Sequence, residues 1–315
     1  MPPSIQPSVE VSIDGSIANN NPADNNIVKQ CTDTNSKDDI IYTNKLKEMH
    51  KALPTSTQAE RHRFLIADRQ GNTKAAIEKL QNYLDWREEH VDDELSHLDS
   101  WSYATQIAMN HQARRTAKKG NSINDSGIDS TNTYKLPCPL FMYEHESTST
   151  TNTSINNSVT TTTTRMKYIQ HLPARIDLKL ADNSTYALAL ALYIDHILDR
   201  NSTEKATLVI DVRPGYGWSN IKAIQLLPFI QMVSKLLCDL FPSRLEKCIV
   251  YPVPKVATFL WKTIQPFVGT ETVDKICLIS GSAGKKDKVP TNVSKYLDEE
   301  LIAKLEERRT SLFIR

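Results

Sequence analysis

The chain has 315 residues, a formal net charge of +1 and an apolar fraction of 39%. Domains that bind nucleic acid through bulk charge usually carry a large basic excess, so this balance argues against that class. The apolar fraction is below the roughly 45–50% usual for globular domains, and the deficit is concentrated in two polar segments, residues 1–38 and 147–165. Because neither can bury enough apolar surface to offset the entropy of ordering, we expect the first to be a disordered tail and the second an insert without fixed structure.

The five cysteines and eight histidines are scattered along the chain. No Cys-x-x-Cys pair occurs and no histidine spacing is typical of metal ligands, so we predict neither a disulfide framework nor a metal site. Cys238, Cys248 and Cys277 fall in or beside predicted buried elements. The start, MPPSIQPSVEVSIDGSI, has no apolar signal-peptide core, and no run approaches the roughly 18 apolar residues of a membrane span. These features predict a cytoplasmic protein.

Residues 39–92 are predicted to form a small helical subdomain. Residues 40–52 favour one helix, and residues 61–90 favour two helices around a turn. The second of these two carries an apolar face at helical spacing, which indicates packing in a bundle. The face contains Ala76, Leu80, Tyr83 and Leu84. Residues 93–135 show a weak helical pattern and then a polar stretch, and we interpret them as an irregular linker.

Residues 136–290 have the pattern of an α/β domain. Strands are predicted at residues 138–145, 206–212, 247–253 and 275–280. The last three are short, β-branched and almost continuously apolar, which is typical of strands buried on both faces of a mostly parallel sheet. Helices are predicted at residues 186–198, 219–241, 255–268 and, as a C-terminal helix within residues 291–315, at Val293–Arg308. The alternation of strands and helices indicates crossover units.

No catalytic motif stands out in the chain. The loop from Gly281 to Lys286 follows a strand, but it has two residues between its glycines where a phosphate-binding P-loop needs four. No Gly-x-Ser-x-Gly elbow is present to carry a nucleophilic serine. Asp211 ends a strand at the side where open α/β sheets bind ligands, but a turn-stabilising role is the simpler interpretation. We therefore predict a protein that is not an enzyme and has no cofactor.

Several motifs follow one another in the order found in one protein family. They are Arg63-Phe64-Leu65 ahead of Trp86-Arg87, then LVIDV, FPSRLEK running into IVYPVP, and PFVGTETVDKI before the last strand. With this ordered set, residues 45–310 resemble the CRAL-TRIO lipid-binding family, which includes the phosphatidylinositol-transfer proteins. The resemblance implies a helical N-terminal subdomain and an α/β domain with an internal apolar lipid pocket. It also implies a gate helix that closes the pocket and opens at membranes.

The resemblance also implies roles for particular residues. In the members that bind phosphatidylinositol, a threonine and a lysine one helical turn apart hold the inositol phosphate, and Thr272 and Lys275 stand at these positions. A basic pair of the family aligns with Asp68-Arg69, so only Arg69 keeps the charge, and Ser243 replaces a glutamate that contacts inositol. The implied gate residues are Val256, Phe259, Leu260, Ile264 and Phe267.

The pattern alone leaves other interpretations open. The apolar stripe of helix 255–268 also fits an ordinary amphipathic helix on a sheet, and a lysine near a helix end also complements the helix dipole. Our leading prediction is a carrier, in transient contact with membranes, that binds a phospholipid such as phosphatidylinositol and transfers it or presents it to lipid-modifying enzymes. One alternative is a ligand-free module that binds proteins through its surface and its C-terminal helix. Another is a carrier of a phosphate-free apolar ligand such as a prenyl lipid or a sterol.

Overall fold

The computed structural model describes residues 37–68, 71–118, 136–153, 158–254, 261–262, 265–267 and 270–314. The chain divides into two compact units, residues 1–44 and 45–315. The described part of the first unit is the beginning of helix α2, Lys37–Ala52, and all other elements belong to the second unit. The predicted tail lies outside the described residues up to position 36, and its last two residues are helical.

The N-terminal part of the second unit is helical, as predicted. After α2 come α3 Gln58–Ala67, α4 Thr73–His90, the 3-10 turn η1 Asp93–Leu95 and α5 Ser100–Lys118. A capping box starts α3, since Thr57 Oγ1 accepts from the Glu60 N–H at 3.1 Å and the Glu60 carboxylate accepts from the Thr57 N–H at 2.8 Å. The side chain of Asn72 accepts two backbone N–H groups of the first turn of α4. These caps define two separate helices where the sequence predicts them.

The apolar face predicted for α4 packs into a helical core. Ala76, Leu80 and Tyr83 are buried, and the Tyr83 ring lies 5.6 Å from the ring of Phe64 in α3. Helix α5 is longer than the weak pattern in the predicted linker indicates. It is held by a buried face that contains Trp101, Tyr103, Ala104, Ile107 and Ala108. The linker is therefore helical as far as Lys118.

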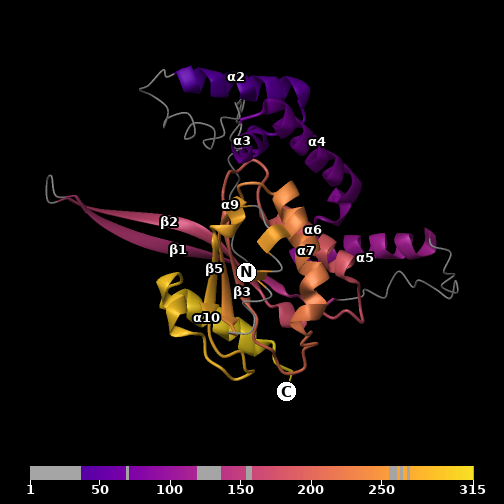
Figure 1. The fold of residues 1–315 in the computed structure, drawn as a ribbon, viewed down its shortest axis with the longest axis vertical. Helices are drawn as coiled ribbons and strands as arrows, with labels where there is room; N and C mark the ends of the chain where they lie inside the picture. The colour runs from indigo at the N-terminus through magenta and orange to yellow at the C-terminus, as the bar shows by residue number, and fades with distance from the viewer. Residues whose placement is uncertain are drawn as a thin grey trace, which may run out of the picture. The chain divides into compact units, whose positions relative to one another are not determined.

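A five-stranded sheet in the order β1-β2-β3-β4-β5 forms the rest of the second unit (Figure 1). The strands are β1 Leu140–Thr153, β2 Ser158–His171, β3 Ala206–Asp211, β4 Leu245–Val253 and β5 Ile276–Ser280. β1 and β2 are antiparallel, whereas β2, β3, β4 and β5 pair in parallel. The prediction of an α/β fold with a mostly parallel sheet is confirmed.

The expectation that residues 147–165 lack fixed structure is wrong for most of this segment. β1 and β2 pair along their whole lengths and continue through it. Because β3 pairs with β2 only over residues 167–171, the rest of the hairpin is a two-stranded ribbon, which extends beyond the sheet in Figure 1. Threonine is β-branched and favours extended backbone. A hairpin also pairs its backbone groups across the ribbon, so the segment gains order without an apolar core.

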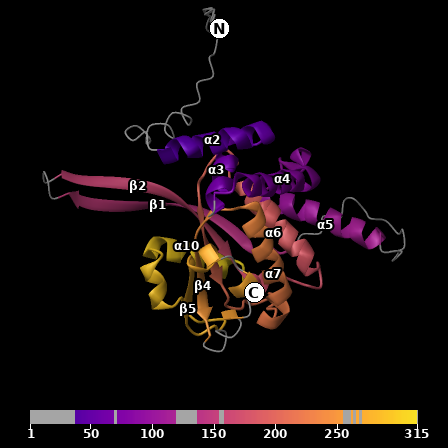
Figure 2. The same cartoon turned by 45° about the horizontal axis from the view of Figure 1, so that its top comes forward.

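Helices cover both faces of the sheet, with α6 and α7 on one side and α10 on the other (Figure 1 and Figure 2). The remaining elements are η2 Pro173–Arg175, α6 Asn183–Ile197, α7 Ala223–Leu240, η4 Gln265–Phe267, α9 Thr270–Val273, η5 Thr291–Lys295 and α10 Glu299–Ser311. The sequence of α6 is apolar on all sides, and every residue from Thr185 to Ile194 is buried. Pro228 lies inside α7 without splitting it.

Helix α7 departs from two expectations. By length and composition it is apolar enough to cross a membrane, whereas we expected no such segment. This property is weak evidence for a membrane span, because core helices of soluble proteins share it. Cys238 of α7 is exposed, so the prediction of buried surroundings is wrong for this cysteine, which lies on the outer side of the helix. Leu226, Phe229 and Leu240 are the buried residues of α7, and much of its apolar surface is only partly covered.

The predicted C-terminal helix, Val293–Arg308, is two elements, η5 and α10. Helix α10 begins where it does because Asp298 is its N-cap, with Oδ1 accepting from the Leu301 N–H at 2.8 Å. Leu301 and Leu305 are fully buried in a cluster with residues of β3, β4 and β5. One face of α10 is therefore part of the core, which leaves only its outer face for the protein-binding alternative.

Asp211, at the end of β3, belongs to a buried ion-pair network. Its carboxylate accepts from Arg213 Nη2 at 2.7 Å and Nε at 2.9 Å, and neither side chain is exposed. Arg213 also donates to the Asp287 carbonyl at 2.6 Å and to Glu306 of α10, while Arg309 Nε lies 3.5 Å from Asp211. The Arg213 N–H donates to Asp211 at 3.0 Å, which confirms the turn-stabilising role.

Candidate functional site

The two faces of the sheet differ in how completely they are covered. Side chains alternate along a strand, so Val209, Ile249 and Tyr251 share one face in register across β3 and β4. All three are buried in the cluster that includes Leu301 and Leu305 of α10. This face is closed by α10.

The opposite face is apolar and only partly covered over β3, β4 and β5. Ile210, Val250 and Leu278 lie in register across the three strands, and Leu208 precedes Ile210 on the same face of β3. Leu208, Ile210 and Val250 are partly buried, and Leu278 is exposed. Leu278 is the most open of the four, with 36% exposure. Over β2 the same face is closed, since His171 is buried and its ring lies 6.2 Å from Phe229 of α7. An apolar strip is thus left beside α7, and we call these four residues the open strip.

The gate helix is predicted in the segment between β4 and β5. Val256, Phe259, Leu260 and Ile264 lie outside the described residues. Phe267 ends η4, but its side chain also lies outside the part of the chain that the structure describes. The described turn η4 contacts α7, the helix that borders the open strip.

The two predicted headgroup residues lie in one turn. Thr272 belongs to α9, and Lys275 immediately precedes β5. The Lys275 N–H donates to the Thr272 carbonyl at 3.1 Å, and the Lys275 carbonyl accepts from the Cys248 N–H of β4 at 2.9 Å. Both side chains are partly buried. Arg69 lies outside the described residues, so the structure brings together two of the three predicted contacts.

Two arginines that the motifs contain, but that we did not assign to the site, are buried near each other. Arg63 of α3 is 1% exposed, and Arg244, just before β4, is 4% exposed. Within the described residues, Arg63 Nε and Nη2 and Arg244 Nε have no hydrogen-bond partner. Burial lowers the pKa of Arg244 to about 10, with the charge of Arg63 as the next cause. Guanidinium N–H groups bind carboxylates and phosphates well, so this pair could hold an anion.

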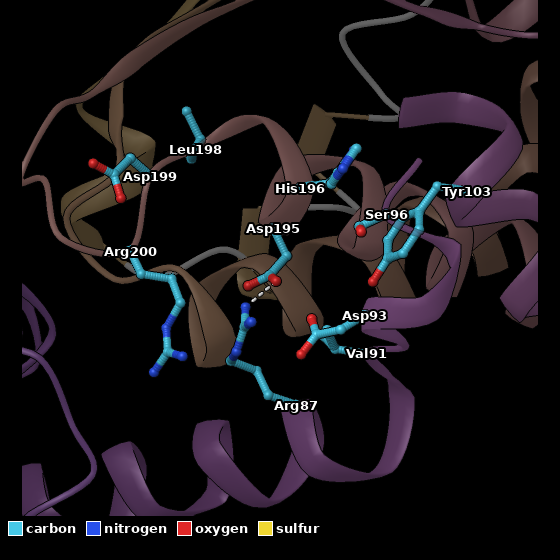
Figure 3. Close-up of a pocket in the computed structure, with 10 residues that line it drawn as sticks. All are labelled: Arg87, Val91, Asp93, Ser96, Tyr103, Asp195, His196, Leu198, Asp199 and Arg200. Atoms are coloured by element: carbon cyan, nitrogen blue, oxygen red, sulfur yellow. Dashed lines mark hydrogen bonds and ion pairs between the residues drawn. The ribbon is translucent and has the colours of Figure 1, made fainter. Parts of the chain in front are cut away.

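A cavity of about 220 Å³ lies among residues of α4, α5 and α6 and the loops beside them (Figure 3). Its lining is largely charged: Arg87 donates to Asp195, which also accepts from the Tyr83 hydroxyl at 3.0 Å. The Tyr103 ring stacks on His196 with 4.5 Å between centroids. Pockets for drug-sized ligands are mostly apolar and span about 300–1,000 Å³. This cavity is too small and too charged to hold an acyl chain.

Comparisons with known proteins bear on the sheet and the helices around it. Residues 164–305, from β2 into α10, match the sequence profile of the CRAL/TRIO domain. No curated protein matches the chain. Among solved structures, the crystal structure of Sfh5 is similar, with a TM-score of 0.47 and 13% sequence identity over 76% of this chain and 67% of that chain. The motifs and the profile match agree, and residues 164–305 have the sequence of a CRAL/TRIO domain.

Proposed function

We propose that the protein binds a phospholipid with an anionic headgroup and, without catalysing a reaction, transfers it between membranes or presents it to other proteins. The profile match supports the coarser statement that it binds a lipid or another apolar ligand. The main support for the proposal is the open strip, the apolar part of the sheet face that the described residues leave partly uncovered. We also propose that the protein is cytoplasmic and contacts membranes only transiently.

The energetics of a lipid chain explain why such a strip is needed. Each buried CH₂ contributes about 0.8 kcal/mol, so a chain of about 16 carbons left in water would cost roughly 12 kcal/mol. An acyl chain lying on Leu208, Ile210, Val250 and Leu278 would remove from water both its own apolar surface and that of the open strip. In this proposal, the apolar residues between Val256 and Phe267 cover the bound chain and move aside at a membrane.

The headgroup part of the proposal rests on charge. A phosphate cannot enter an apolar site unpaired. Lys275 supplies a cation and Thr272 a hydroxyl donor from the same turn, and a charge-assisted hydrogen bond there contributes about 1.5–3 kcal/mol. Arg244 also lies at the edge of the sheet where the parallel strands begin. The buried Arg63 and Arg244 are a second pair that a phosphate would satisfy.

The chain-binding part is tested by loading the purified protein from liposomes that contain a fluorescent phospholipid. Leu278→Asp places a charge on the open strip and is expected to reduce loading at least tenfold. Leu180→Asp is the matched control, because Leu180 is an exposed leucine in the turn before α6. Equal loading by the Leu278 variant and the parent would contradict a ligand on this face.

The headgroup part is tested with Lys275→Ala and, as a control, the exposed Lys295→Ala. We expect the first variant to lose its preference for phosphatidylinositol over phosphatidylcholine while still loading lipid. If it binds phosphatidylinositol as the parent does, the headgroup assignment is wrong. The carrier of a phosphate-free apolar ligand then becomes the better interpretation.

A further inference from the structure

Three side chains capable of binding a metal meet where α4 ends beside α5. Glu89 and His90 are the last two residues of α4, and His111 lies in α5. The His90 and His111 rings are stacked, with 4.7 Å between centroids and 13° between planes. One ligand atom from each of the three residues lies within 4.8 Å of the other two. No motif of the CRAL/TRIO resemblance includes these residues.

The hydrogen bonding of His90 prepares it for coordination. His90 Nδ1 lies 2.9 Å from the Trp86 carbonyl, which can only accept, so Nδ1 carries the proton. Nε2 is then left with a free lone pair. Histidines that bind metals almost always donate their other ring N–H in this way, often to a backbone carbonyl. The Trp86 ring stacks on His90 at 5.4 Å, so His90 is held between Trp86 and His111.

The donor set and the freedom of the side chains suit zinc. Two imidazoles and one carboxylate, with water in the fourth position, form a known tetrahedral zinc set. With metal–ligand distances of about 2.0–2.1 Å, the ligand atoms would lie about 3.3 Å apart. The ligand atoms, which lie within 4.8 Å of one another, would need to close by at most about 1.5 Å, and the Glu89 side chain, which is 71% exposed, is able to reorient. The cations near His111 are Arg114 and Arg115. The Arg115 side chain donates hydrogen bonds to Asp182 and Ser184.

We propose that Glu89, His90 and His111 form a zinc site that ties the end of α4 to α5. The rings alone already hold the two helices together by stacking. Zinc adds a coordinate link across the same contact, so occupancy of the site stabilises the helical subdomain against unfolding.

The test is a titration of the full, EDTA-treated chain with zinc chloride, followed by calorimetry. We expect one site, with affinity at least tenfold weaker in His90→Asn and in His111→Asn, and unchanged in His97→Asn, an exposed histidine outside the cluster. Glu89→Gln is also expected to weaken zinc binding, and because the Glu89 side chain is 71% exposed, we expect little effect on folding. Zinc should raise the Tm of the parent and of His97→Asn, but not that of His111→Asn.

Two results would overturn the proposal. One is a parent protein that binds no zinc. The other is zinc affinity that remains unchanged when either histidine is replaced, which would place the binding elsewhere on the chain and leave the ring stack as a structural contact. Circular dichroism without zinc checks that each variant is folded before its affinity is compared.

Discussion

Replacing Arg213 with methionine tests how α10 is attached to the sheet. The Arg213 guanidinium donates to Asp211 through two nitrogens and to Glu306 of α10, and it also bonds the Asp287 carbonyl. Neither Arg213 nor Asp211 is exposed, whereas the Glu306 side chain is 30% exposed. Methionine replaces the apolar stem of arginine but not its guanidinium group, so the change removes the charge and its hydrogen bonds while keeping the packing of the stem.

The expected loss follows from the carboxylate left behind. Removing one partner of a buried ion pair typically costs about 3–5 kcal/mol, because the other charge stays buried without compensation. Arg309 Nε, 3.5 Å from Asp211, remains as a weaker partner, so we expect a value near the lower end, about 3 kcal/mol. For a domain of this size that corresponds to a fall in Tm of about 6–12 °C.

Urea denaturation followed by circular dichroism measures the free energy of unfolding. The matched control is Lys304→Met, which breaks an exposed pair with Glu300 one turn away in α10 and should cost less than about 0.5 kcal/mol. The double variant Asp211→Asn/Arg213→Met should recover part of the loss, since it removes the stranded charge. A loss below about 1 kcal/mol for Arg213→Met would refute the buried network.

Three further predictions concern single positions. Burial lowers the pKa of His171 to about 4, so between pH 6.5 and 4 the unfolded chain takes up a proton that the folded chain does not. The free energy of unfolding should therefore fall by about 3 kcal/mol as the pH falls through this window. His171→Phe should remove this pH dependence, while the control His97→Asn should keep it. The same pH dependence in the parent and in His171→Phe would contradict the prediction. Asp298→Ala should cost about 1 kcal/mol in urea denaturation, and Asp298→Asn much less, because asparagine also caps α10; equal costs would argue against the cap. Arg63→Met should lower the free energy of unfolding by no more than about 1 kcal/mol, because, within the described residues, two of its nitrogens have no partner and only its hydrogen bond to Tyr83 is lost; a loss above about 3 kcal/mol would contradict this.

The strands β3, β4 and β5 could be predicted closely because both of their faces are apolar, although the face opposite α10 is only partly covered. Their side chains on either face are apolar, so each strand appears as one continuous run bounded by polar residues. The run 206–212 corresponds to β3, Ala206–Asp211. The long hairpin gave no such signal, because its threonine-rich strands are stabilised by pairing with each other rather than by burial.

The site could be predicted only where chain neighbours form it. Thr272 and Lys275 are one turn apart, so their spacing already indicates that they meet. Arg63 and Arg244 come from different elements, and so do His90 and His111, and no spacing along the chain shows that such residues become neighbours. The closed face of the sheet likewise depends on α10 packing from the far end of the sequence.

Native mass spectrometry of the purified full chain, with organic extraction of whatever is bound, shows whether the protein carries a phospholipid. We predict one phospholipid per protein, either carried from expression or taken up from liposomes, and its loss in Leu278→Asp but not in Leu180→Asp. A protein that is empty as purified and takes up no lipid from liposomes of any composition would contradict this prediction.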